Sequence, residues 1–112
     1  MTKIEAIIRP SQYDKVQEAL ANIGIDGVTV SEVRGHGRQK GHSENYRGRE
    51  YEINLVPKLR LEIVVTDNRV DALIEAILEN AATGEIGDGK IFIYKAEDAI
   101  RIRNQERGDS AL

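Results

Sequence analysis

Hydrophobic and polar residues alternate along several short segments of the chain, which is the pattern of strands that bury one face. The clearest segment is 58–66 (KLRLEIVVT), and 3–9 (KIEAIIR) follows the same pattern. Segment 25–34 (IDGVTVSEVR) returns to β character after Gly27. A short apolar segment, 90–95 (KIFIYK), follows a glycine-rich turn and completes the set. The pattern therefore predicts a strand at each of these places.

Helical spacing of apolar residues occurs between the strands of each half of the chain. The apolar positions are Tyr13, Val16, Ala19, Leu20 and Ile23 in the first half, and Val70, Leu73, Ile74, Ile77, Leu78 and Ala81 in the second. Ser11 and Asp67 precede these stripes and suit the N-cap position. Gly24 and Gly84 follow them and suit the end of a helix. We also expect a short helical turn at 97–100 in the charged tail.

The two halves have the same order of elements, strand-helix-strand, with a long connection between them. Two split βαβ units that share one antiparallel sheet, with both helices on one face, form the α+β ferredoxin-like fold. In strand 58–66 the leucines and isoleucines would face the helices, and Lys58, Arg60, Glu62 and Val64 the other side. That side is too apolar for a fully wet surface and too charged for a core. It indicates either a subunit interface with ligand clefts or a partly wet sheet face.

The connection between the halves, about 35–54, has no periodicity and contains four glycines. A loop near 20 residues long is unusual in a compact domain and tends to be functional or disordered. We expect residues 37–53 to be mobile without a ligand or partner. Segment 34–60 carries a net charge of +4 within a chain of net charge −3. Such a segment suits an anionic ligand or an acidic partner, or is simply a solvated loop.

Length and composition narrow the class of protein further. The 112 residues form one domain, and the lack of cysteine excludes disulfides, thiolate metal sites and cysteine nucleophiles. The negative net charge argues against nucleic acid as a partner. No apolar run approaches a membrane span, and the opening residues lack the apolar stretch of a signal peptide. We therefore expect a cytoplasmic protein without direct membrane insertion.

The first candidate site is the segment Gly84–Lys90, which matches the G-x-x-x-x-G-K start of a phosphate-binding loop. Ile91 stands where such a loop needs Ser or Thr for Mg²⁺, and a strand follows instead of a helix. This excludes a P-loop ATPase. Backbone N–H groups of the glycines and the charge of Lys90 can still bind an anion, although a simple turn before a strand would have the same sequence.

Other candidate groups lie at the loop base and in the tail. Arg38 and Lys40 can meet phosphate, and Gln39 offers an amide oxygen to a hard cation. Arg101 and Arg103 project to one side of an extended segment and suit bidentate contacts to oxyanions, or serve only solubility. The two loop histidines have no third ligand nearby, which argues against zinc. No catalytic constellation is evident, so we expect a protein that is not an enzyme.

Three segments, TVSEVRGHGRQKGHSENYRGREY (29–51), TGEIGDGKIF (83–92) and IRIRNQERG (100–108), closely resemble the nitrogen-regulatory P-II signalling proteins. With the opening KIEAIIRP, the resemblance covers essentially the whole chain. It implies a single P-II-type domain over 1–112, assembled as a homotrimer that binds ATP or ADP in clefts between neighbouring subunits. It also implies that the protein senses 2-oxoglutarate with Mg²⁺. Through a loop at about 36–54 it would control targets such as an ammonium channel and nitrogen-assimilation enzymes or regulators.

The resemblance also implies roles for individual residues, within a nucleotide loop at about 82–90 and a C-terminal loop at about 101–112. The positions around the base and ribose are Ile7, Thr29, Glu62 and Val64. The positions at the phosphates are Arg38, Gly87, Asp88, Gly89, Lys90, Arg101 and Arg103. The positions at 2-oxoglutarate and Mg²⁺ are Gln39, as metal ligand, and Lys58, with Gly37, Lys40 and Gly41 along the backbone. Gly35 is a further cofactor-binding position. Tyr51 matches the tyrosine that a nucleotidyltransferase modifies in some lineages.

The sequence departs from the family pattern at the loop base and near the nucleotide loop. His36 stands where the family often has Phe, and Ala82 where it usually has Arg. Three alternatives remain open: a trimer that senses only ATP and ADP, an adaptor for a membrane transporter, and a small enzyme on the same fold. Gln39, Lys58 and the nucleotide motifs argue against the first two, and the missing catalytic pair argues against the third.

Overall fold

The structure is a computed structural model of the chain, and it describes residues 1–37 and 55–112. The elements in chain order are β1 (Thr2–Ile8), the 3₁₀ turn η1 (Pro10–Gln12), α1 (Tyr13–Asn22), β2 (Thr29–Gly35), β3 (Val56–Val65), the 3₁₀ turn η3 (Asp67–Arg69), α2 (Val70–Ala81), β4 (Lys90–Lys95) and the 3₁₀ turn η4 (Gly108–Ala111). Among the described residues no helix is long and apolar enough to cross a membrane.

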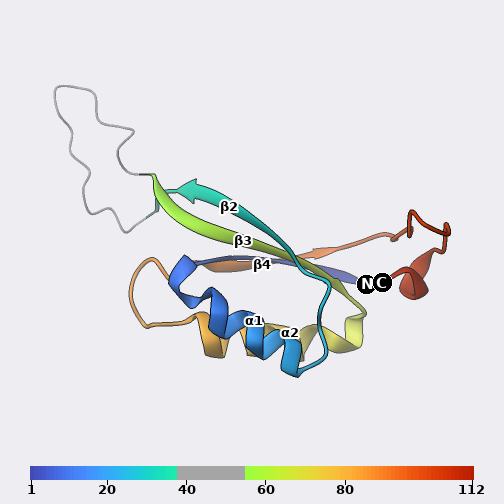
Figure 1. Cartoon of the computed structure of the whole chain (residues 1–112), viewed down its shortest axis with the longest axis horizontal. Coiled ribbons are helices and arrows are strands. Elements are labelled where there is room, and N and C mark those ends of the chain that lie inside the picture. The colour runs from blue at the N-terminus through green and yellow to red at the C-terminus, as the bar shows by residue number, and fades with distance from the viewer. Residues whose placement is uncertain (38–54) are drawn as a thin grey trace.

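The strands form one antiparallel sheet in the order β2-β3-β1-β4, and α1 and α2 lie together on one of its faces (Figure 1). This arrangement confirms the predicted ferredoxin-like fold. Each strand-helix-strand unit crosses over so that β1 and β3 pair at the centre, leaving β2 and β4 at the edges. The end of β1, the start of β3 and the start of β4 are therefore brought to the same end of the sheet.

The core lies between the sheet and the helices, and its residues follow the predicted periodicity. The fully buried members are Ile4, Ala6, Ile8, Val16, Leu61, Ile63, Leu73 and Ile77. Those from the strands are every second residue, and those from the helices recur at helical spacing, because only one face of each element meets the other layer. Burial of these aliphatic side chains, about 1.5–3 kcal/mol for each large one, is what stabilises the two-layer arrangement.

The opposite side of the sheet, here called the open face, is not covered by a helix. Strand pairing assigns to it Lys3, Glu5, Ile7, Thr29, Ser31, Val33, Lys58, Arg60, Glu62, Val64, Lys90, Phe92 and Tyr94. Both predicted faces of β3 are confirmed, since Leu61 and Ile63 are buried and Arg60 and Glu62 lie on the open face. The mixture of charged and apolar groups on this face is thus a property of all the strands.

Both predicted N-caps are wrong, because each helix is preceded by a 3₁₀ turn that contains the expected capping residue. Ser11 lies within η1, and no side chain caps α1. Asp67 begins η3, and its carboxylate accepts a hydrogen bond from Thr2 Oγ1 at 2.7 Å. This bond, the N-terminal ammonium and Lys95 lower the pKa of Asp67 to about 2. Asp67 therefore ties the start of β1 and the end of β4 to the α2 entrance.

Two further segments can be compared with the prediction. The second strand begins at Thr29, close to its expected start after Gly27, and the segment around Asp26 and Gly27 is an irregular connection. The expected helical turn at 97–100 is absent, since Ile100 instead pairs with Arg107 in an antiparallel bridge. Gly24 does follow α1 with a φ of +81°, as predicted for a glycine that ends a helix. Residues 96–112, here called the C-terminal arm, project beyond the end of the sheet (Figure 1).

Candidate functional site

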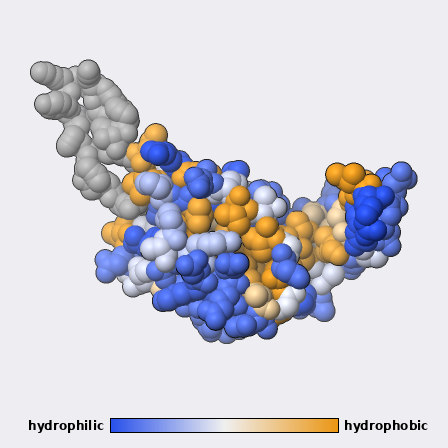
Figure 2. Space-filling model, viewed as in Figure 1, coloured by the Kyte–Doolittle hydropathy of each residue, from blue (hydrophilic) through white to orange (hydrophobic). Residues whose placement is uncertain are grey.

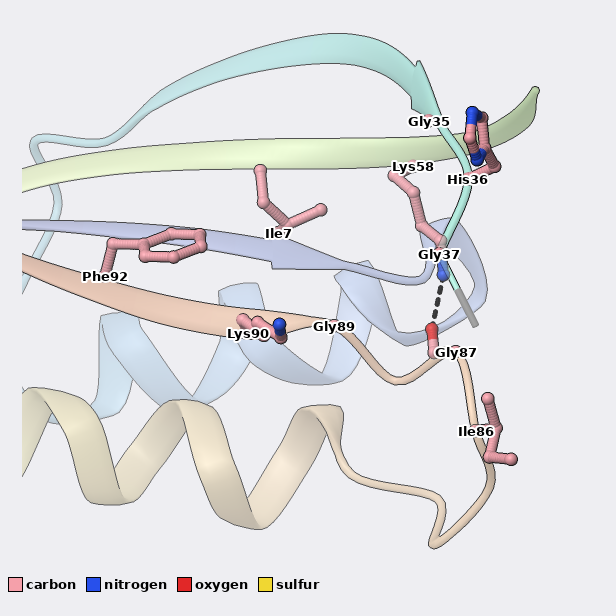
Figure 3. Close-up of a pocket in the computed structure, with 10 residues that line it drawn as sticks. All are labelled: Ile7, Gly35, His36, Gly37, Lys58, Ile86, Gly87, Gly89, Lys90 and Phe92. Carbon is pink, nitrogen blue, oxygen red and sulfur yellow. Dashed lines mark hydrogen bonds between the residues drawn. The ribbon is translucent and has the colours of Figure 1, made fainter. Parts of the chain in front are cut away.

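A cavity of about 610 Å³ opens at the end of the sheet where β2 ends and β4 begins. Its lining comes from several parts of the chain (Figure 3): Ile7, Gly35, His36, Gly37, Lys58, Ile86, Gly87, Gly89, Lys90 and Phe92. Most of these residues belong to the open face or to the loop that joins α2 to β4. The cavity has the size of a pocket for a small organic ligand, and two lysines give it a positive charge.

The loop of residues 82–89, between α2 and β4, is held in shape by one carboxylate. Asp88 accepts hydrogen bonds from the backbone N–H of Thr83 at 2.7 Å and of Gly84 at 2.8 Å. It also accepts one from the Thr83 hydroxyl at 2.5 Å and one from Arg9 Nε at 2.8 Å. The Arg9 guanidinium, followed by these other donors, holds the pKa of Asp88 well below its usual range. Asp88 is therefore ionised and organises the loop from within.

Two glycines shape the side of this loop that faces the cavity. Gly87 and Gly89 have φ values of +107° and +100°, which favour glycine strongly. A Cβ on Gly89 would lie 1.8 Å from the carbonyl oxygen of Ile7. The loop can approach β1 this closely only because residue 89 has no side chain. As a result the backbone of Gly89 packs against Ile7 of β1, and both residues line the cavity.

Lys58 connects β3 to the 82–89 loop across the cavity. Its ammonium donates a hydrogen bond to the carbonyl oxygen of Gly87 (Figure 3). Burial lowers the pKa of Lys58, and the positive charge of Arg9 lowers it further. An anion bound nearby would raise this lowered pKa, because it would favour the charged form of the lysine.

Further along the open face, charged groups from β1 and β3 pair with one another. Lys3 Nζ lies 2.9 Å from Glu62, and Tyr94 donates a hydrogen bond to Glu5 at 2.9 Å. The hydrogen bond from Lys3 lowers the pKa of Glu62, and the bond to Glu5 raises the pKa of Tyr94. Arg60 Nε lies 3.9 Å from Glu5 and is buried without a hydrogen-bond partner among the described residues. The face therefore holds a donor that a single chain, as described, leaves unsatisfied.

The structure gathers some of the predicted site residues and separates others. Those that line the cavity are Ile7, Gly35, Gly37, Lys58, Gly87, Gly89 and Lys90. Thr29 and Glu62 pair with each other on the open face, and Val64 lies on the same face, all outside the cavity lining. Asp88 points its carboxylate into its own loop. The predicted residues Arg38, Gln39, Lys40, Gly41 and Tyr51, with most of the expected 37–53 loop, lie outside the described residues.

Arg101 and Arg103 lie in the C-terminal arm, away from the cavity. Lys90 starts β4 at the cavity, whereas the arm leaves from the other end of the strand, after Lys95 (Figure 1). Arg101 is paired with Glu106 inside the arm. One chain therefore does not bring the arginines of the arm to the lysines of the cavity.

Three further residues line the cavity that the sequence does not single out as contributors to this site: His36, Ile86 and Phe92. Strand alternation could have predicted Phe92, because it lies two residues after Lys90 and therefore on the same face of β4. Ile86 is 69% exposed within a polar turn. An apolar residue in such a turn could have indicated a contact with a ligand or partner. In the sequence, His36 stands out only as an improbable zinc ligand and as a departure from the family pattern at the loop base, and the described residues contain no cluster of three or more metal-binding side chains.

Comparison with known proteins identifies relatives along the full chain. A family model described as nitrogen regulatory protein P-II matches residues 1–106. A protein of Pasteurella multocida named nitrogen regulatory protein P-II is 59% identical over 112 residues, with 100% of both chains covered. Nitrogen regulatory protein P-II 1 of Escherichia coli K12 is 54% identical over the same length, again with 100% of both chains covered.

A solved structure shares the fold as well as the sequence. The crystal structure of Arabidopsis thaliana PII bound to citrate aligns with a TM-score of 0.81 at 46% sequence identity. The alignment covers 99% of this chain and 91% of the plant chain. Similarity at this level extends over the sheet and both helices.

Proposed function

The chain belongs to the nitrogen regulatory P-II family, and from this premise we propose that it is a signal-transduction regulator of nitrogen metabolism rather than an enzyme. In this proposal it acts in the cytoplasm, binds ATP or ADP, and responds to 2-oxoglutarate with Mg²⁺. Its targets are proteins such as an ammonium channel and nitrogen-assimilation enzymes or regulators, which it contacts through the 36–54 loop. Tyr51 is the proposed target of a modifying nucleotidyltransferase.

The observation that carries the proposal is the separation of the cationic groups along β4. Lys90 lies at the cavity, and Arg101 and Arg103 lie beyond the opposite end of a strand of six residues. At about 3.3 Å per residue, the strand alone separates its two ends by about 17 Å. The arm projects further beyond that end (Figure 1), and Arg101 is held there by Glu106, so one copy with this fold does not place all three cations on a single triphosphate. We therefore place the nucleotide between neighbouring copies of a homotrimer.

Within such a cleft the residues would divide their roles by chemistry. Backbone N–H groups at Gly87 and Gly89 and the ammonium of Lys90 suit the phosphates, with Arg101 and Arg103 of a neighbouring copy. Asp88, already ionised and fully hydrogen-bonded, shapes the loop instead of contacting phosphate through its carboxylate. Ile7 with the open-face positions Thr29, Glu62 and Val64 would surround the base and ribose.

The 2-oxoglutarate part of the proposal rests on Lys58 and Gln39. Lys58 lies at the cavity with a lowered pKa, so a carboxylate is a favourable partner for it. The Arabidopsis relative is described as bound to citrate, also a small polycarboxylate. Mg²⁺, when bound, would supply oxygen coordination that joins the phosphates to the keto acid, with Gln39 as a ligand.

Calorimetry with 2-oxoglutarate in the presence of Mg-ATP, of Mg-ADP and of no nucleotide tests this proposal. We expect tight binding with Mg-ATP only, and by thermodynamic reciprocity the keto acid must tighten ATP by the same factor. Lys58→Met should lose the keto acid and keep ATP, while Lys15→Met, an exposed lysine on α1, should change neither. Keto-acid binding that ignores nucleotide would contradict the mechanism.

One observation favours a second candidate function, a trimer that senses only ATP and ADP. Lys58 already donates to the Gly87 carbonyl, so a carboxylate would have to replace this contact. In that case calorimetry would show normal nucleotide binding and no heat from 2-oxoglutarate under any condition. A transporter adaptor would bind neither ligand.

A further inference from the structure

The C-terminal arm is folded on itself by hydrogen bonds within its own length. The backbone N–H of Arg101 donates to the carbonyl oxygen of Glu106 at 2.9 Å, and that of Gln105 donates to Arg101 at 2.7 Å. Gln105 adopts a φ of 65°, which closes the turn. Asp98 accepts hydrogen bonds from the backbone of Ala99 and Gly108, which lower its pKa. The arm is thus folded into a defined conformation and is not an extended tail.

This turn holds the guanidinium of Arg101 at two points. One terminal nitrogen is paired with a carboxylate oxygen of Glu106, and the other donates to the carbonyl oxygen of Ser110 at 2.9 Å. Glu106 is itself oriented by Asn104, whose side-chain amide donates to the same oxygen at 3.2 Å. The Arg101 side chain is 31% exposed. Two anchors on one planar group fix the direction in which its remaining donors point.

Arg103, the second arginine of the arm that is predicted to contact phosphate, is in a different state. Arg103 is exposed and makes no hydrogen bond or ion pair with any residue of 1–37 or 55–112. The two arginines therefore differ in freedom: one is oriented before any ligand arrives, and the other must be ordered by the ligand. An oriented guanidinium loses less conformational entropy for each hydrogen bond that it forms.

We propose that Glu106 is a positioning residue for anion binding, which holds Arg101 so that its unused N–H groups are presented to a phosphate oxygen. A guanidinium carries five N–H donors, and Glu106 and Ser110 occupy two of them. This inference rests on the proposed function, because it takes the ligand to be a nucleotide phosphate. In this inference Glu106 does not contact the ligand and acts only through Arg101.

Glu106 also carries a negative charge near the proposed anion, so two effects oppose each other. At a separation of about 6 Å in water, removal of one like charge would tighten anion binding about threefold. A charge-assisted hydrogen bond lost through a disordered Arg101 would weaken it by about ten- to a hundredfold. The positioning effect is the larger one, and the net expectation for Glu106→Gln is ATP binding weaker by about tenfold.

A double-mutant cycle with Mg-ATP, measured by calorimetry, separates positioning from a general effect on the arm. Glu106→Gln should weaken ATP in the parent by about tenfold, whereas in an Arg101→Ala background, where only the removal of its charge remains, it should tighten ATP by about threefold. Glu97→Gln removes the same charge from the same arm, where Glu97 makes no side-chain hydrogen bond or ion pair with the described residues, and should leave affinity within about twofold of the parent. Equal or tighter binding by Glu106→Gln, or the same loss with and without Arg101, would overturn the proposal.

A second readout does not depend on the nucleotide. NMR relaxation of the Arg101 Nε–H group in the free protein should report an ordered side chain that becomes mobile in Glu106→Gln and stays ordered in Glu97→Gln. If this holds and ATP still fails to bind the parent protein, the proposed function is wrong while the positioning of Arg101 stands. An Arg101 side chain that is equally mobile in parent and Glu106→Gln would overturn the positioning itself.

Discussion

Gly89 is the residue at which the 82–89 loop and strand β1 come closest. Its φ of +100° is one constraint, and the second is the carbonyl oxygen of Ile7, which would lie 1.8 Å from a Cβ at this position. Gly84 has a similar φ of +91° but open space around it. A side chain at Gly84 would therefore cause backbone strain alone, whereas a side chain at Gly89 would cause the same strain and a steric collision.

Gly89→Ala should destabilise the protein more than Gly84→Ala. For Gly84→Ala we expect only the backbone term, about 1–3 kcal/mol of lost unfolding free energy. Gly89→Ala adds a collision with backbone atoms that cannot move away without shifting β1, and it should also weaken ATP binding. Urea denaturation gives the two free energies and calorimetry the affinities. Equal losses of stability would show that the close contact with Ile7 does not exist.

At the scale of elements, long-range polar contacts tie the ends of the strands to the rest of the fold. Asp67, at the start of η3, accepts a hydrogen bond from Thr2 of β1 and lies 3.4 Å from Lys95 of β4. The N-terminal ammonium lies 3.2 Å from the same carboxylate. Arg9 and Asp88 make a comparable link between the end of β1 and the loop before β4. Each link joins elements that are far apart in sequence.

The Asp67 link predicts a specific pH dependence of stability. Its folded pKa of about 2 lies below the ordinary aspartate value of 3.8, so its contribution is present above about pH 4 and is lost as the pH falls toward 2. Asp67→Asn should therefore lower the melting temperature at neutral pH, and the difference from the parent should shrink as the pH falls through this range. Asp71→Asn, which removes the same charge from the exposed first turn of α2, serves as the control. A parent–mutant difference that stays constant over this range would contradict the assignment.

At the scale of the whole molecule, the open face is the side of the sheet that no helix of the described residues covers (Figure 1) and that holds a hydrogen-bond donor left unsatisfied by those residues. Arg60 Nε is buried without a hydrogen-bond partner among the described residues, and Phe92 and Tyr94 are 45% and 47% exposed. The C-terminal arm carries apolar surface as well (Figure 2). Ile102 of the arm is 95% exposed. Apolar groups and unsatisfied donors on one side of a sheet are features of a surface that another protein surface covers.

We predict that the protein in solution is a homotrimer. Multi-angle light scattering at micromolar concentration should give three times the chain mass of 12.5 kDa. Glu62→Lys would place two positive charges where Lys3 and Glu62 now pair on the open face, and it should shift the mass toward the monomer. Lys15→Glu, a charge reversal on the helix side, should leave the assembly intact. A monomeric parent protein would remove the basis for clefts between subunits.

The sequence alone determined the strands, the helices and the two faces of the sheet. Alternation in 58–66 and helical spacing from Val70 to Ala81 are local patterns, and local geometry converts them directly into buried and open faces. The glycines and lysine of the 82–90 segment were also recognisable as a candidate anion site, because their chemistry depends little on distant residues.

Only the tertiary structure decided which distant side chains meet. Asp88 lies in a segment with the chemistry of an anion site, and only the structure shows that Arg9 and Thr83 bind its carboxylate and make it the organiser of its loop. Asp67 has the context of a helix cap, yet it binds Thr2, 65 residues away. His36 and Phe92 join one cavity, while Lys90 and Arg101 are kept apart by the length of β4. These outcomes follow from strand order and register, which bring together residues that no local period relates.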